Sequence, residues 1–147
     1  MAVISAAGNG GLMGSSTSVR ERYTYPGATT GVIGVGGLAG NSSDKMWDGT
    51  SYNHSVPNYS KYEDMFCDVF APSDYMFGCV NHSGKKYEGI TEHWQGTSFA
   101  SPIVAGIAAL YFEKNPNNSV TKFEHDLYSA CYQFGEPSRT GYGRVDV

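Results

Sequence analysis

The sequence predicts an α/β fold with a partly parallel sheet. Three short apolar runs, at 2–6, 31–36 and 67–72, are each stopped by glycine or proline, which is typical of buried strands. A small, uncharged, apolar stretch at 96–110 and an amphipathic stretch from 120 onward predict two helices. Strands and helices in this order favour a sheet covered by helices. Only one strong helix lies between the apolar strands and the C-terminal region, which indicates an incomplete sheet.

The first strand runs into a glycine-rich loop at 7–11. A buried strand at this position needs neighbours on both sides. Further along, Tyr25-Pro26-Gly27 predicts a turn, and an aromatic residue before proline raises the chance of a cis peptide bond.

The second strand runs into G-V-G-G-L-A at 34–39, which formally matches a dinucleotide-binding fingerprint. That fingerprint requires a helix to begin there. The residues that follow, G-N-S-S-D at 40–44, have turn chemistry instead. We therefore do not expect nucleotide binding.

The middle of the chain predicts loops and one hairpin. Residues 41–66 are polar and aromatic without periodicity, which indicates a surface loop region. A third strand ends at Pro72. Two β-prone runs, at 76–80 and 87–92, flank N-H-S-G-K at 81–85 and predict an antiparallel hairpin leading to Gly96.

The stretch from Gly96 predicts a tight turn and a helix buried on all sides, with Ser98 at its N-terminus. Free backbone N–H groups and the positive end of the helix dipole could stabilise a developing negative charge there. The alternative is a structural helix capped by Thr97 or Ser98. For the second helix, Ser119 is the expected cap. Its apolar residues follow helical spacing: Val120, Phe123, Leu127, Cys131 and Phe134.

Length and charge exclude several classes of protein. The 147 residues suffice for one domain, 1–147, with a core of its own. The net charge is −4 and no basic cluster exceeds Lys85-Lys86, so we expect no nucleic-acid partner. No apolar run reaches the roughly 18–20 residues that span a bilayer, and no signal peptide is visible. We therefore expect no membrane partner.

Three cysteines, Cys67, Cys79 and Cys131, lack metal-ligand spacing, and they could form one disulfide or remain three thiols. Five of the eight asparagines begin N-x-S sequons. This favours a secretory route in a glycosylating host. The alternative is that asparagine and serine meet often because both favour turns. The five are Asn41, Asn53, Asn58, Asn81 and Asn117.

Two residues suit acyl transfer by serine, which needs a nucleophile, a base and donors aimed at the oxyanion. Ser98 at a helix N-terminus could supply the nucleophile, and its own N–H could be one donor. The side-chain amide of Asn9, on the loop after a strand, could be a second donor. The alternative for Asn9 is a residue that tolerates a left-handed turn before Gly10.

The order of the motifs resembles the C-terminal half of a subtilisin-like serine protease. The blocks are A-A-G-N at 6–9, Y-P-G at 25–27, V-I-G-V-G at 32–36, D-V-F-A-P at 68–72 and G-T-S-F-A-S-P-I-V-A-G at 96–106. The resemblance implies the subtilisin-like three-layer parallel-sheet fold, here only its C-terminal part. It also implies that Ser98 is the nucleophile of a serine endopeptidase and that Asn9 is the oxyanion-hole side chain. Ala6, Ala7 and Gly8 would form one wall of the substrate pocket, with Thr97 also substrate-binding, and Tyr25-Pro26 would be at a position often cis.

Ser73 departs from the family pattern, which has glycine there, and we expect this to alter only a turn. A larger departure is that the catalytic Asp and His of such proteases precede the A-A-G-N strand. We therefore expect the chain to be inactive alone and to need an N-terminal protease segment, in cis or in trans, to act on polypeptides.

Two alternatives remain for the function. One is a degenerate, non-catalytic binding or structural module. The other is an esterase that uses Ser98 with Glu113 and His125, although G-T-S-F-A at 96–100 is not the G-x-S-x-G motif. We do not expect another histidine to replace the base: His54 and His82 lie in polar loops within sequons, and His93 is five residues before Ser98 on the strand leading into it.

The resemblance also bears on cofactors and location. Calcium is common in the family, but no dense acidic loop is present, so no metal ligand is assigned. Secretion is expected from the family and from the sequons. Apolar surface on the first strand and on the helix after Pro102 predicts self-association through an exposed sheet edge.

Overall fold

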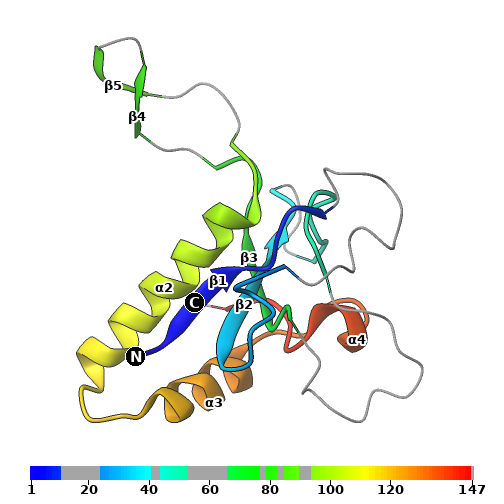
Figure 1. Cartoon of the computed structure of the whole chain (residues 1–147), viewed down its shortest axis with the longest axis vertical. Coiled ribbons are helices and arrows are strands. Elements are labelled where there is room, and N and C mark those ends of the chain that lie inside the picture. Colours follow the sequence, from blue (N-terminus) through cyan, green and yellow to red (C-terminus); the bar gives the residue numbers. More distant parts are fainter. Residues whose placement is uncertain are drawn as a thin grey trace.

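The computed structural model describes residues 1–10, 24–40, 44–52, 66–76, 79–82, 85–89 and 94–146; in 79–82 and 85–89 only the backbone is described. Three strands, β1 (Val3–Ala6), β2 (Val32–Leu38) and β3 (Val69–Pro72), form one sheet in the order β1-β2-β3 (Figure 1). Both pairs are parallel, with Val3 opposite Val32 and Val35 opposite Val69. The predicted parallel sheet is confirmed.

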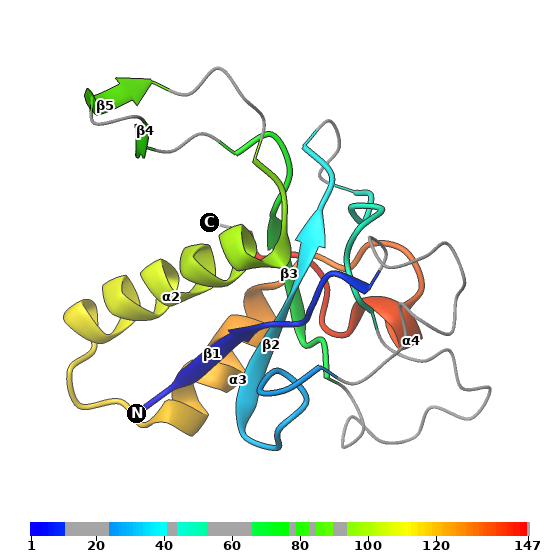
Figure 2. The same cartoon turned by 45° about the horizontal axis from the view of Figure 1, so that its top comes forward.

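The second sheet is a hairpin of β4 (Cys79–His82) and β5 (Lys85–Gly89), which pair in antiparallel fashion. This confirms the predicted hairpin, although its strands lie closer to the turn than the predicted runs at 76–80 and 87–92. Both views show it well away from the three-stranded sheet, beyond the end at which α2 (Thr97–Lys114) begins (Figures 1 and 2). An antiparallel bridge between Met76 and Trp94 joins the chain on its two sides.

Two core clusters cover the two faces of the sheet, because successive strand residues point to opposite faces. On one face lie α2 and α3 (Val120–Ala130), whose side chains pack on β2 and β3. That cluster comprises Ile33, Val35, Val69, Ala71, Ala100, Val104, Ala108, Phe123 and Leu127. The opposite face packs against residues from loops and from the region of the short helix α4 (Pro137–Thr140). That second cluster comprises Ala7, Leu38, Tyr52, Phe66, Cys67, Phe70 and Phe134.

Glycines on β2 let this second layer approach closely. A Cβ at Gly34 would lie 2.0 Å from the Phe66 carbonyl oxygen, and one at Gly36 would lie 2.4 Å from the Phe70 ring. Residues 34–38 therefore belong to a packed strand, and no helix begins there. The G-V-G-G-L-A stretch therefore lacks, over these residues, the helix start that the dinucleotide fingerprint requires.

The helix α2 is buried along one face, whereas the sequence predicted burial on all sides. Its buried residues are Thr97, Ala100, Val104 and Ala108, which recur at helical spacing over the sheet. The opposite face, including Ala105 and Ala109, is exposed, and Leu110 is 66% exposed. Within the described chain, the sheet and α3 pack on the buried face of α2, and its opposite face remains exposed.

The second helix begins as predicted but ends earlier. Ser119 is the N-cap of α3, and its Oγ accepts a hydrogen bond from the Lys122 N–H at 3.1 Å. The helix ends at Ala130, so Cys131 and Phe134 lie beyond it. Phe134 packs in the second core cluster, against the opposite face of the sheet from Phe123.

The two edges of the sheet differ. Residues 143–145 run beside β3, with the Phe70 N–H donating to the Gly143 carbonyl and the Val145 N–H donating to the Phe70 carbonyl. Among the described strands, β1 has β2 as its neighbour on one side only. It is an edge strand, half-buried and with Val3 41% exposed, where the sequence predicted a buried one.

The turn at 25–27 and the region 41–66 were also predicted from the sequence. The Tyr25–Pro26 peptide bond is cis, as expected. The region 41–66 was predicted to be a surface loop, but its described residues include the buried Trp47, Thr50 and Tyr52. No helix in the described part of the chain combines the length and apolar character needed to cross a bilayer.

Candidate active site

The loop that follows β1 meets the first turn of α2. The Asn9 Oδ1 accepts two hydrogen bonds from Thr97, one from its backbone N–H at 3.0 Å and one from its hydroxyl at 2.8 Å, across 88 residues of sequence. Because Oδ1 faces two donors, the orientation of the amide is fixed and Nδ2 is its remaining hydrogen-bonding group. The structure thus orients Asn9 as a donor.

Thr97 lies beneath this site. Its side chain is 1% exposed, and its Oγ1 also accepts a hydrogen bond from the Gly8 N–H at 3.3 Å. One hydroxyl therefore joins the loop after β1 to the start of α2.

Ser98 is the second residue of α2 and is exposed. At this position its backbone N–H has no carbonyl partner within the helix. The N-cap is Gly96, with φ +144° and no side-chain cap bond, so the expectation that Thr97 or Ser98 caps the helix is wrong. Instead, Asn9 bonds the first N–H of the helix from a distant loop.

Gly96 lies against Asn9 and bonds Ser73. A Cβ there would lie 3.4 Å from the Asn9 Nδ2, and its φ is one that side-chain-bearing residues rarely adopt. Its N–H donates to the Ser73 carbonyl at 2.8 Å. Ser73 is itself fully buried, and its hydroxyl donates to the Leu38 carbonyl at 3.1 Å. Ser73, which stands where the family pattern has glycine, therefore links β3 to the start of α2. The sequence alone did not reveal this link.

The predicted pocket wall, Ala6 to Gly8, lies at the end of β1. Ala7 is fully buried in the second core cluster, and its N–H donates to the Val35 carbonyl at 2.9 Å. Ala6 and Gly8 are half-buried. Because the Ala7 side chain faces the core, any contact that this residue makes with a ligand would come from its backbone.

A support behind the Asn9 loop was missed in the sequence. The Ser51 N–H donates to the Gly8 carbonyl at 2.8 Å, and the Ser51 Oγ accepts from the Gly10 N–H at 3.0 Å. Next to it, the buried Thr50 Oγ1 accepts from the Gly37 N–H at 2.9 Å. The two residues read as ordinary turn chemistry in sequence, because nothing local marks serine or threonine as buried.

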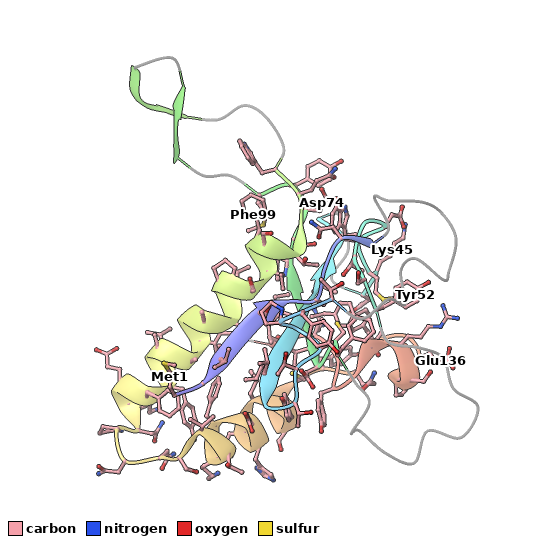
Figure 3. All side chains as sticks on the ribbon, viewed as in Figure 1. Met1, Lys45, Tyr52, Asp74, Phe99 and Glu136 are labelled. Atoms are coloured by element: carbon pink, nitrogen blue, oxygen red, sulfur yellow. The ribbon has the colours of Figure 1, made fainter. Side chains whose placement is uncertain are left out.

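Two aromatic side chains contact each other at the start of α2. Phe99 and Trp94 contact each other edge to face, with ring centroids 6.1 Å apart, and Trp94 is 41% exposed. Figure 3 shows Phe99 at the same end of the molecule as Asp74, where α2 begins.

The triad of the esterase alternative does not form, because Ser98 and Glu113 lie far apart on α2. Glu113 follows Ser98 by 15 residues on the same continuous helix, which separates them by about 22 Å along its axis. His125 lies on α3 with its side chain 74% exposed, and its Nδ1 is 3.4 Å from the Asp126 Oδ1. His54 and His93 lie outside the described residues, and His82 is described only as backbone of β4.

Perturbed ionisable groups lie away from Ser98. Burial raises the pKa of Asp68, just before β3, to about 7. Burial also raises the pKa of the Cys67 thiol and brings that of Cys131 to about 12, so neither is a reactive thiolate at neutral pH. The Cys79 side chain lies outside what is described. Among the described residues, no cluster of three His, Cys, Asp or Glu could hold a metal ion.

Comparison with known proteins identifies the relatives of this chain. The Peptidase_S8 family model, described as the subtilase family, matches residues 1–143. Subtilisin DY of Bacillus licheniformis is 28% identical over 145 residues, which cover 99% of this chain and 44% of that protein. Subtilisin E of Bacillus subtilis (strain 168) is 30% identical over 145 residues, covering 99% of this chain and 32% of that protein. The chain thus spans less than half the length of these relatives.

Solved structures agree in fold. Sphericase matches with a TM-score of 0.71 at 24% identity, over 98% of this chain and 47% of that one. The prenylagaramide maturation protease PagA matches with a TM-score of 0.68 at 23% identity, over 99% of this chain and 48% of that one. These two likenesses establish the partial subtilisin-like fold.

Proposed function

Because the chain belongs to the subtilase family of serine peptidases, we propose that it is the C-terminal part of a catalytic domain that cleaves polypeptides. The observation that carries the proposal is the pair of hydrogen bonds from Thr97 to the Asn9 Oδ1. They hold Asn9 at the helix terminus that bears an exposed serine and leave its Nδ2 as the donor of that side chain.

In this proposal the Ser98 Oγ attacks the carbonyl carbon of the scissile peptide bond, and the carbonyl oxygen becomes negatively charged. The Asn9 Nδ2 and the Ser98 backbone N–H donate to that oxygen. Donors fixed in advance are effective because they need no reorganisation during the reaction. Removing one such donor typically lowers kcat by about 10²–10³.

Thr97 is assigned a positioning role, because its hydroxyl is already engaged by Asn9 and Gly8 and its side chain is buried. Residues Ala6 to Gly8 would line the pocket for the substrate residue before the scissile bond. For Ala7 this contact would use the backbone.

A serine hydroxyl is a poor nucleophile without a base. The partner we propose is an N-terminal protease segment that supplies the Asp and the His. Two features suit such a partner: the exposed apolar face of α2, around Ala105, Ala109 and Leu110, and the edge of β1. The 147-residue chain alone is then inactive. Secretion belongs to the same proposal, and no residue is assigned to calcium.

A fluorophosphonate probe tests the proposal, because it labels only a serine that a base has activated. We expect no labelling of the 147-residue chain alone. Co-expression with a segment that carries the D-x-G and H-G-T blocks, read from the coding sequence upstream of Met1, should produce stoichiometric labelling of Ser98.

The Ser98→Ala variant is the matched control, and it should remain unlabelled in both arms. Labelling of the chain alone would show a working base within it and refute the proposed inactivity. Failure to label in a stable complex that contains both blocks would favour the non-catalytic module.

A further inference from the structure

The turn between α2 and α3 contains one of the five sequons, Asn117-Asn118-Ser119. The Asn118 N–H donates to the Asn115 carbonyl at 3.1 Å, so Pro116 and Asn117 are the two corner residues of a β-turn. Proline is favoured at the first of these corner positions. The turn is thus an ordered, exposed corner of the molecule.

The asparagines of this turn have different environments. The Asn115 Nδ2 donates to the Tyr111 carbonyl at 3.0 Å, and the Asn118 Nδ2 donates to the Tyr111 hydroxyl at 2.7 Å. Asn117 is exposed, and within the described part of the chain its side chain makes no hydrogen bond. Two amides hold the turn, while the amide of the sequon stays accessible.

We propose that Asn117 is an acceptor site for N-linked glycosylation. In the transfer, a bond forms between the Asn117 Nδ2 and the anomeric carbon of an oligosaccharide carried on a lipid diphosphate. The bond from that carbon to the diphosphate oxygen breaks, the lipid diphosphate leaves, and the amide nitrogen loses one proton. Transferases of this class read an N-x-S or N-x-T sequon on accessible chain.

The hydroxyl that the transferase requires is also the helix cap. The Ser119 Oγ accepts from the Lys122 N–H in the folded chain. The transfer therefore takes place before α3 closes on its cap, and the same hydroxyl then stabilises the helix.

A glycan at Asn117 is compatible with chemistry at Ser98. Glycosylation itself does not depend on that chemistry. Asn117 follows the C-terminal end of α2, and Ser98 lies at its N-terminal end. With 18 residues in α2, the two ends are about 27 Å apart. A glycan at Asn117 thus leaves the Ser98 end open.

The test uses the full chain behind a cleavable secretory leader, translated in the presence of microsomes. A C-terminal acceptor tag with a sequon of its own counts the translocated molecules. Trypsin releases residues 115–122, in which Asn117 is the only sequon asparagine. Removing the glycan enzymatically in ¹⁸O-water leaves a heavy-oxygen aspartate at 117, which mass spectrometry detects.

We expect the heavy-oxygen aspartate in wild type and in Ser119→Thr, which keeps both sequon and cap. We expect it to be absent in Asn117→Gln and in Ser119→Asp, which keeps a cap but removes the sequon. An unmodified Asn117 in translocated wild-type chains would overturn the proposal. Modification that persists in Ser119→Asp would also overturn it.

Discussion

At the scale of single residues, the Thr97 hydroxyl holds the candidate oxyanion donor in place. It donates to the Asn9 Oδ1 and accepts from the Gly8 N–H. Replacing Thr97 with valine keeps the shape of the side chain and leaves each of its two half-buried partners short of one hydrogen bond. We expect a loss of about 1–3 kcal/mol in the free energy of unfolding, measured by urea denaturation.

The control for this change is Thr97→Ser, which keeps the hydroxyl and removes one methyl group. We expect it to lose less than half as much stability. If valine and serine destabilise the chain equally, the methyl packing of Thr97 matters and its hydrogen bonds do not.

Asp68 predicts a pH dependence of stability. Its Oδ2 accepts from the Gly34 N–H at 2.7 Å, yet burial raises its pKa to about 7, with the charge of Glu124 on α3 adding to the effect. Tyr128 of α3 and Cys67 also face its charge. Since the pKa in the folded state exceeds the ordinary carboxyl value of 3.8, the folded state favours the protonated acid. Its contribution is fully present below pH 4 and is lost as the pH rises through about 7.

The measurement is the free energy of unfolding of wild type and Asp68→Asn between pH 4 and pH 8. A pKa rise of about three units corresponds to a difference on the order of 4 kcal/mol between the two ends. We expect the free energy of unfolding of Asp68→Asn to increase relative to that of wild type as the pH rises. A constant difference across this range would show that Asp68 is ionised throughout.

At the scale of elements, α2 has one buried face and one exposed apolar face. Val104 is fully buried over the sheet, whereas Leu110 is 66% exposed. We expect Val104→Ala to lower the free energy of unfolding by about 2 kcal/mol, because it leaves a cavity in a close-packed core. Leu110→Ala on the other face should change it by less than about 0.5 kcal/mol.

Equal losses in these two variants would contradict the one-sided burial. Chemical denaturation of the isolated chain measures both, at a low protein concentration that excludes association through the exposed face. Ala105→Ser offers a second, milder change on the same exposed face and should likewise be near neutral.

Sequence patterns correctly predicted the elements whose local residue pattern matches their burial in the fold. Strands β2 and β3 follow from apolar runs ended by glycine or proline, and α3 follows from its cap and spacing. The patterns failed where tertiary contacts decide. The apolar face of α2 predicted burial that the described chain does not provide, and the residues near Thr50 looked like surface turn while they support the Asn9 loop.

At the scale of the whole molecule, the candidate site could be predicted in part. Ser98 stands out in the sequence because it follows the tight turn at Gly96, and Asn9 stands out because it lies in the glycine-rich loop after the first strand. The structure brings these two segments together. The links through Ser51 and Ser73 could not be predicted, since they join residues more than twenty positions apart through backbone groups that every residue carries and through hydroxyls that look like ordinary turn chemistry in the sequence.

The same incomplete architecture predicts self-association of the isolated chain. The β1 edge has unpaired backbone groups on one side among the described strands, and α2 exposes small apolar residues and Leu110. Open edges and apolar faces of this kind promote pairing with another chain. We expect the sedimentation coefficient of the wild-type chain to rise with protein concentration.

A charged substitution on each surface distinguishes association through the β1 edge from association through the exposed face of α2. Val3→Lys places a charge on the β1 edge, and Leu110→Lys places one on the exposed face of α2. If the edge drives association, Val3→Lys alone should make the chain monomeric, whereas Leu110→Lys should not. The reverse result would assign association to the helix face. A wild-type chain that stays monomeric at every concentration would show that neither surface binds a second copy, and it would leave the proposed N-terminal segment as the occupant to test.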